Sequence, residues 1–103
     1  MNKSALHGKL KAKEGMALKL AEILLKAATL LENAKGCNLY LVSTDPGDLN
    51  SVWITEVWDS KLDHQNSLKN KEIKALIGRA MPLLDGLPEK GQELEVFGGK
   101  GIN

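Results

Sequence analysis

The sequence offers few side chains that could carry out acid–base chemistry, and His64 is the first of them. An imidazole titrates near neutral pH and can take a proton from a phenolic hydroxyl. Ser67 follows His64 by one helical turn and could orient a substrate oxygen or the imidazole itself. Both residues also have purely structural explanations. His64 could be hydrogen-bonded to a neighbouring strand or lie at a pocket rim, and Ser67 could bond back to a helix carbonyl.

Three aromatic residues, Tyr40, Trp53 and Trp58, could form flat walls for a substrate that contains a ring. Aromatic side chains on a sheet more often pack in a core or in a dimer contact. Successive side chains alternate between the two faces of a strand, so Trp53 and Trp58 face opposite ways. At most one of them is therefore expected to line the ligand site.

Three further residues complete the set of possible substrate-binding side chains. Glu56 lies in a strand among apolar neighbours, so it is expected to be paired or to line the pocket. The simpler explanation for Glu56 is a partner in a second subunit or a hydrogen bond between strands. Asn38 and Met81 are weaker candidates, which more often occupy core or edge positions.

The metal-ligating residue types do not form a site in the sequence. The two histidines, His7 and His64, and the single cysteine, Cys37, are far apart and lack the spacing of metal ligands. Cys37 has no second cysteine for an internal disulfide and is interpreted as a structural thiol near a strand start. We therefore expect no metal site.

Charge and hydropathy argue against two classes of partner. The 14 basic residues are balanced by 13 acidic ones, and a net charge of +1 gives no electrostatic footprint for nucleic acid. The richest apolar stretch, residues 16–31, is interrupted by charged side chains, and residues 1–10 contain no apolar signal region. Membrane spanning and secretion are not predicted, and the expected location is the cytoplasm.

The first half of the chain shows a strand, a helix and a hairpin. Residues 4–12 alternate weakly, and from residue 16 the apolar period changes to that of a helix, which Gly36 is positioned to end. Residues 38–44 and 52–58 are rich in strand formers, and the turn formers at residues 45–50 between them predict a hairpin with a longer loop.

The second half predicts two more helices and a final strand. Ser60 is a plausible N-cap for a helix over residues 61–69, and Asn70 for a second helix from residue 71. Pro82 lacks a backbone donor, so this helix should kink or end near residues 81–85. The last strand begins at about Gln92.

This order of elements defines the predicted fold class. The elements follow the order β-α-β-β-α-β. This is the order of a ferredoxin-like α+β sandwich, which has an antiparallel sheet with both helices on one face. With 43% hydrophobic and 26% charged residues, we expect a single globular domain over residues 1–103. The strands carry large apolar groups on both faces, so the second face needs a cover, and a second copy of the sheet is the economical one. Leu18 and Leu25, which point away from the helix core face, are either scattered surface residues or an extension of such a contact.

The chain also resembles a known family, the antibiotic-biosynthesis monooxygenases. The resemblance extends from about residue 6 to residue 97 and rests on residues 53–60, then His64, Ser67 and Leu68, then residues 75–77 and 81–84, with residues 8–15 and 36–37 fitting the same pattern. It implies a homodimeric α/β barrel in which two sheets pack face to face, with a pocket in each subunit between sheet and helices. It further implies relatives that oxidise dihydroxyaromatic substrates to quinones with molecular oxygen, without metal or flavin.

A haem-degrading branch of the same superfamily is similar in fold. The resemblance implies that this branch needs an Asn in the first strand and a Trp and a His in the second helical region, and the matching positions here are Gly8, Ser67 and Ile77. No histidine is then placed as a proximal haem ligand, so haem oxygenation is not expected.

The leading hypothesis is therefore a small homodimeric, cofactor-independent monooxygenase that acts on a quinol or another polyhydroxylated aromatic, with His64 as base and the residues discussed above shaping the pocket. One alternative is a non-catalytic dimer of the same fold that binds a small aromatic or isoprenoid-like ligand. Another is a purely structural dimer whose pocket is filled by its own side chains. The sequence identifies neither the substrate nor the sheet face that holds the pocket.

Overall fold

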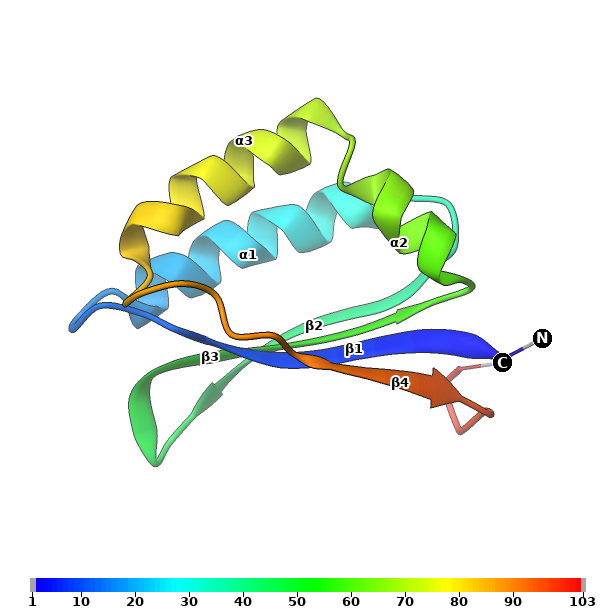
Figure 1. Cartoon of the computed structure of the whole chain (residues 1–103), viewed down its shortest axis with the longest axis horizontal. Helices are drawn as coiled ribbons and strands as arrows, with labels where there is room; N and C mark the ends of the chain where they lie inside the picture. Colours follow the sequence, from blue (N-terminus) through cyan, green and yellow to red (C-terminus); the bar gives the residue numbers. More distant parts are fainter. Residues whose placement is uncertain (1, 103) are drawn as a thin grey trace.

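The computed structural model describes residues 2–102 and has the predicted ferredoxin-like α+β architecture. In chain order the elements are β1 (Lys3–Lys11), α1 (Ala17–Leu31), β2 (Cys37–Asp45), β3 (Asp48–Trp58), α2 (Lys61–Ser67), α3 (Lys71–Ala80), the 3-10 turn η1 (Met81–Leu83) and β4 (Gln92–Val96). The four strands form one antiparallel sheet in the order β2-β3-β1-β4. All the helices within residues 2–102 lie on one face of this sheet, and none of them covers the opposite face (Figure 1).

Helix α1 forms because its apolar residues recur on one face. Leu20, Ile23, Ala27 and Leu31, which recur three or four residues apart, are buried, as the sequence predicts. The helix ends at Leu31, earlier than the predicted stop at Gly36. That prediction was wrong because a further turn separates α1 from β2, and the positive φ of Gly36, +80°, serves this turn instead of the helix end.

The hairpin between β2 and β3 is tighter than predicted. Asp45 pairs with Asp48, so only Pro46 and Gly47 form the connection, and residues 49–51 belong to β3. The Asp45 carboxylate accepts a hydrogen bond from the backbone N–H of Gly47 at 2.8 Å and closes the turn. The prediction of a longer loop over residues 45–50 was wrong, because only two of these turn-forming residues are needed to connect the strands.

Helices α2 and α3 begin at the predicted caps. The Ser60 hydroxyl accepts from the backbone N–H of Asp63 at 3.1 Å, and the Asn70 carbonyl oxygen accepts from Glu72 and Ile73. Helix α3 ends at Ala80, and Pro82 lies in η1, where its missing N–H is tolerated.

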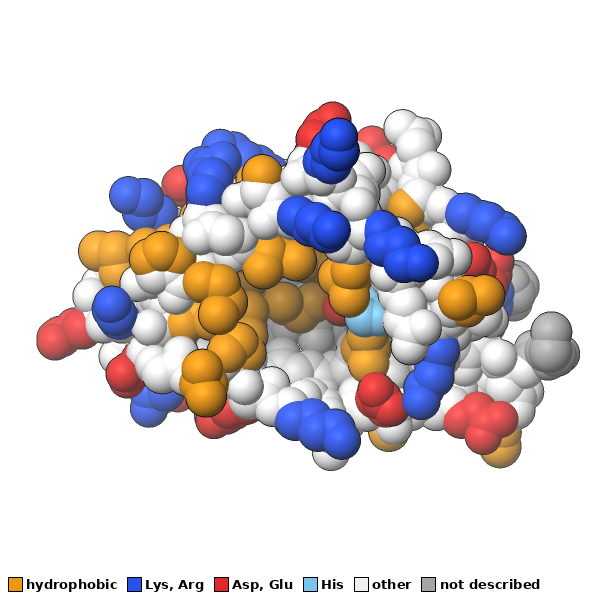
Figure 2. Space-filling model, turned by 45° about the horizontal axis from the view of Figure 1, so that its top comes forward, with side chains coloured by type: hydrophobic (Ala, Val, Ile, Leu, Met, Phe, Trp, Pro, Cys, Tyr) orange, Lys and Arg blue, Asp and Glu red, His pale blue; other side chains and the backbone are white. Residues whose placement is uncertain are grey.

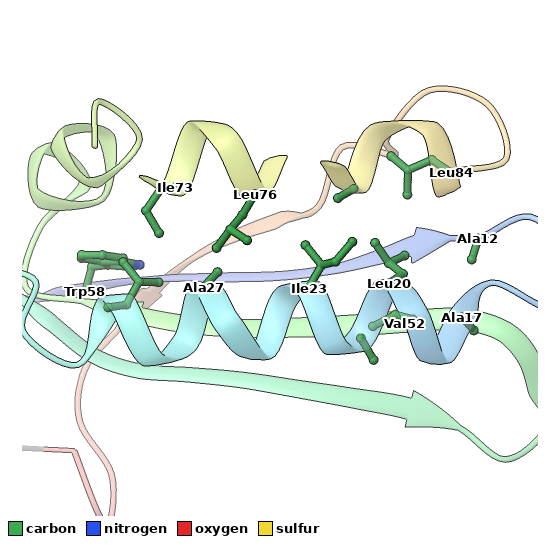
Figure 3. Close-up of a cluster of buried hydrophobic side chains, with 13 residues drawn as sticks. Ala12, Ala17, Leu20, Ile23, Ala27, Val52, Trp58, Ile73, Leu76 and Leu84 are labelled. Atoms are coloured by element: carbon green, nitrogen blue, oxygen red, sulfur yellow. The ribbon is translucent and has the colours of Figure 1, made fainter. Parts of the chain in front are cut away.

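The hydrophobic core lies between the helices and the sheet. Leu20 and Val52 are fully buried and Trp58 is 1% exposed. Figure 3 shows side chains of α1 and α3 converging between the two helices, with Trp58 and Leu84 at opposite ends of the cluster. None of the helices within residues 2–102 has the length and apolar character needed to cross a bilayer.

Candidate active site

A cavity of about 210 Å³ lies between the helix-covered face of the sheet and the three helices. Figure 2 shows it as a hollow bordered by hydrophobic side chains, with the pale blue of a histidine at its side. Within residues 2–102, only four of its lining side chains are polar, namely Tyr40, Glu56, His64 and Ser67. The other lining residues are aliphatic ones, a methionine and a proline. The cavity is therefore apolar with a small polar cluster.

Glu56 and His64 form the centre of this polar cluster. The His64 Nε2 atom lies 3.7 Å from the Glu56 Oε1 atom, and the two side chains are only 23% and 15% exposed. The Trp58 indole N–H donates a hydrogen bond of 3.1 Å to the same Oε1 atom. The Trp58 ring also meets the His64 ring edge-on, with centroids 5.5 Å apart. One aromatic side chain thus holds both members of the pair.

Local structure explains why these residues meet. Glu56 and Trp58 are two positions apart on β3, so both face the helices. The connection to α2 is short, with Ser60 as its N-cap, and His64 comes one turn later. The first turns of α2 therefore return over the end of β3 and place His64 above Glu56.

Burial changes the ionisation of the residues around this pair. Burial raises the pKa of the Glu56 carboxyl, although the Trp58 hydrogen bond and the charge of His64 oppose the change. Burial also raises the pKa of the Tyr40 hydroxyl, and the negative charge of Glu56, its cross-strand neighbour, raises it further. Tyr40 is consequently a neutral donor at physiological pH.

Ser67 has the structural role that the sequence left open. Its hydroxyl donates a hydrogen bond of 2.6 Å to the backbone carbonyl of His64. The side chain lines the cavity, but its proton is already used, so it can only accept a hydrogen bond from a ligand. Met81 lines the same cavity and is 44% exposed, which places it at the rim.

The two tryptophans lie on opposite sides of β3, as strand parity predicts. Trp58 is buried behind the Glu56–His64 pair and is not among the lining residues. Trp53 lies on the uncovered face of the sheet, where it stacks on His7 with ring centroids 5.1 Å apart. Trp53 therefore does not contact this cavity, and Trp58 supports it from behind.

Asn38 also lies outside the cavity. Its side-chain amide donates to the Gly36 carbonyl and to the Asp59 carboxylate, both at 2.9 Å. Asn38 falls where the pairing of β2 with β3 shifts by one residue. These contacts hold the start of β2 in place, and they leave Asn38 outside the ligand cavity.

Sequence reasoning missed the aliphatic walls of the cavity. Ile54 lies two positions from Glu56 on the same face of β3, and Ile23, Ile73 and Ile77 come from the helices. Side chains alternate between the two faces of β3, and this pattern could have identified Ile54 as a neighbour of Glu56 on the same face. Nothing local distinguishes the helix residues from ordinary core residues.

The three positions aligned with the haem-degrading branch can be placed directly. A Cβ atom on Gly8 would come within 3.2 Å of the Gly91 Cα atom, so the strand has little room for a larger side chain there. Ser67 and Ile77 line the cavity but are not haem-ligand types. Within residues 2–102, no group of three or more His, Cys, Asp or Glu side chains is arranged to hold a metal ion.

Comparison with known proteins identifies relatives over nearly the whole chain. Residues 4–79 match the family model described as antibiotic biosynthesis monooxygenase. A candidate antibiotic biosynthesis monooxygenase from Chloroflexus aurantiacus has 35% identity and a TM-score of 0.88, and the match covers 98% of this chain and 99% of that one.

More distant solved structures share the fold. A candidate antibiotic biosynthesis monooxygenase from Caulobacter crescentus has 17% identity and a TM-score of 0.85, with 94% of this chain and 92% of that one covered. A protein of unknown function from Nitrosomonas europaea has 24% identity and a TM-score of 0.79, with 97% and 94% covered. No curated protein matches the sequence.

Proposed function

The chain belongs to the antibiotic biosynthesis monooxygenase family, and from this premise we propose that it oxidises a quinol or another polyhydroxylated aromatic with molecular oxygen and without a cofactor. Family membership supports a monooxygenase-like function in general. The observation that carries the more specific proposal is the Glu56–His64 pair inside an otherwise apolar cavity.

His64 is the proposed general base. The His64 side chain lines the cavity beside the Glu56 carboxylate, so its imidazole can take a proton from a substrate hydroxyl. The resulting imidazolium is stabilised by the negative charge of Glu56, 3.7 Å away. The Trp58 indole fixes the carboxylate for this role.

The proposed reaction is balanced by oxygen alone. Loss of a hydroxyl proton makes the quinol electron-rich enough to reduce O2. One oxygen atom then forms a new C–O bond on the ring, and the other leaves as water, so that quinol and O2 give a hydroxyquinone and H2O. The apolar walls keep bulk water away from the ionised ring.

The proposed assembly is a homodimer formed through the face of the sheet that the helices leave uncovered (Figure 1). Leu41 and Leu94 on this face are 49% and 50% exposed, and Trp53 lies half-buried between neighbouring strands. A second copy would cover these apolar side chains, which supports the face-to-face barrel that the family resemblance implies.

The alternative is a non-catalytic dimer that binds a small aromatic ligand. It is favoured by one observation, because two of the polar side chains that line the cavity already have hydrogen-bond partners within the protein. Ser67 donates to a backbone carbonyl, and Glu56 accepts from Trp58. Under this alternative, ligands bind without consuming oxygen.

Oxygen consumption by the metal-stripped protein tests the proposal. Hydroquinones, catechols and naphthoquinols are supplied, and the initial rate is compared with autoxidation. We expect turnover above autoxidation, and a loss of about 100-fold or more in the His64→Ala variant, because a positioned base contributes about 10²–10⁴-fold. Gln65→Ala is the matched control, since Gln65 is exposed on the same helix.

The outcomes separate the two functions. Turnover that is lost in His64→Ala but kept in Gln65→Ala supports the monooxygenase. An unchanged rate in His64→Ala removes His64 from the mechanism. Saturable binding without oxygen uptake across the whole panel supports the non-catalytic dimer.

A further inference from the structure

We propose that the ligand of this cavity is a single-ring dihydroxyaromatic that carries an aliphatic side chain, with the ring at the Glu56–His64 end and the chain along the gap between α1 and α3. The inference names a substrate class and rests on the proposed function for the chemistry of the ring. Its support comes from the shape and lining of the cavity alone.

The polar lining residues gather at one end of the cavity. Tyr40 is the cross-strand partner of Glu56, and His64 lies over that carboxylate. Ser67 is one turn from His64 on α2. Among the described residues 2–102 these are all the polar side chains of the lining, so side-chain hydrogen-bonding partners for the ring hydroxyls are found at this end.

The cavity extends well beyond this end. Leu10 and Glu56 both line the cavity. Leu10 pairs with Val52, and Val52 lies four residues before Glu56 on the same face of β3. Four residues of strand span about 13 Å, so Leu10 lies about this far from Glu56 along the sheet. On α1 the lining runs from Leu31 back to Ile23, about 12 Å along a helix axis. In Figure 3, Trp58 lies at one end of the core and the lining residue Leu84 at the other.

The far part of the cavity fits a chain better than further rings. Its walls are aliphatic side chains such as Ile23, Ile54 and Ala80, whereas the two aromatic lining rings within residues 2–102, Tyr40 and His64, lie at the polar end. A volume of about 210 Å³ is also below the range of roughly 300–1,000 Å³ typical of drug-sized pockets. One ring with a slender apolar substituent suits these dimensions, whereas a fused polycyclic ligand does not.

The rim continues the apolar surface outward. Ile77 and Met81, four residues apart, line the cavity and are each 44% exposed. Figure 2 shows hydrophobic side chains that extend from the hollow onto the surface. A chain longer than the cavity can therefore lie against apolar side chains as it leaves.

The test is the binding of a series of alkylhydroquinones, from methyl to octyl, measured anaerobically by tryptophan fluorescence or calorimetry so that no turnover occurs. Each buried methylene contributes enough to lower Kd by about fourfold. We expect Kd to fall by about this factor per methylene over the shorter chains and then to level off once the cavity is full. A Kd that does not change from methyl to hexyl overturns the proposal.

Two blocking variants and one control locate the chain. Ala80→Leu and Ala27→Leu each place a larger side chain in the aliphatic part of the cavity, and both should abolish most of the gain with chain length. Ala75→Leu makes the same change at an exposed position of α3 outside the cavity, and should keep the full gain. If the gain persists in a blocking variant whose circular dichroism and unfolding midpoint match the wild type, the chain does not occupy this cavity and the proposal fails.

Oxygen uptake, measured separately, distinguishes this inference from the proposed function. Binding that depends on chain length without oxygen uptake supports the ligand class and contradicts the monooxygenase. Oxygen uptake with equal affinity for all chain lengths supports the monooxygenase and contradicts the ligand class.

Discussion

At the scale of single residues, Glu56 combines a position in the candidate active site with a cost in stability. It is a carboxylate largely removed from water, and its charge is only partly compensated by Trp58 and His64. The pKa of Glu56 is higher in the folded state than in the unfolded state. At a pH between these two pKa values, the folded state therefore binds more protons than the unfolded state. The stability from protonated Glu56 is present below the unfolded pKa and is lost as pH rises through the folded pKa.

Glu56→Gln should therefore stabilise the protein at neutral pH and impair its activity. The amide oxygen can still accept from Trp58, while the buried charge is gone. We expect the thermal midpoint to rise by a few degrees at pH 7 and to change little at pH 4, where the wild-type carboxyl is protonated. Turnover should fall because an imidazolium at His64 loses its counter-charge.

Glu93→Gln is the matched control for this prediction. The ion pair of Glu93 with Lys61, 3.0 Å long, lowers the pKa of this exposed carboxyl, so its contribution has the opposite sign. This variant should not stabilise the protein at pH 7. If Glu56→Gln lowers the midpoint at pH 7, the carboxylate is better compensated than its burial implies.

At the scale of elements, the turn before β2 controls where α2 lies. Gly36 has a φ of +80°, and a Cβ atom there would overlap the Asp63 carboxylate in the first turn of α2. Helix α2 carries His64, so this contact connects backbone conformation to the site.

Gly36→Ala should destabilise the protein by more than Gly15→Ala does. Gly15 has nearly the same φ, +79°, but no atoms near the position of a new Cβ, so its substitution measures the conformational cost alone, about 1 kcal/mol. We expect Gly36→Ala to cost at least about 1 kcal/mol more in urea unfolding, and to reduce turnover by displacing α2. Equal costs for the two variants would show that Asp63 moves aside freely.

The cap of α3 gives a second prediction at this scale. Asn70 accepts from the backbone N–H groups of Glu72 and Ile73, and lies outside the cavity. Asn70→Ala should lower stability by about 1 kcal/mol and leave the affinity for hydroquinones unchanged. Asn66→Ala, at an exposed position of α2 without a capping role, is the control. A change in affinity without a change in stability would contradict the capping role.

At the scale of the whole molecule, the sheet face that no helix within residues 2–102 covers is the surface through which the proposed dimer would form. Leu41 pairs with Thr55 on this face, whereas Leu18 is an exposed residue of α1 on the helical side. If two sheets pack together, only the first leucine lies in the contact.

We expect the protein to sediment as a dimer at micromolar concentration. Leu41→Lys should shift it to monomer, because it buries a charge in the contact, and Leu18→Lys should leave the dimer intact. A wild-type monomer would contradict the face-to-face arrangement. A dimer that is lost in Leu18→Lys and kept in Leu41→Lys would place the contact on the helices instead.

The sequence by itself determined the elements and their faces. Several correct predictions depend only on interactions within one turn or one strand, so they can be recognised locally. They are the caps Ser60 and Asn70, the break at Pro82, and the opposite orientation of Trp53 and Trp58. The order of these elements then allowed few arrangements, and the ferredoxin-like sandwich is the one observed.

Only the tertiary structure decided the site. The sequence placed Glu56 and His64 on different elements, and their 3.7 Å approach depends on how α2 folds back over β3. It also could not show that the Ser67 proton is used by a backbone carbonyl, or that Asn38 and Trp53 lie away from the cavity. The physical reason is that a cavity is space left unfilled where side chains from distant segments meet, and no local pattern records how completely they fill it.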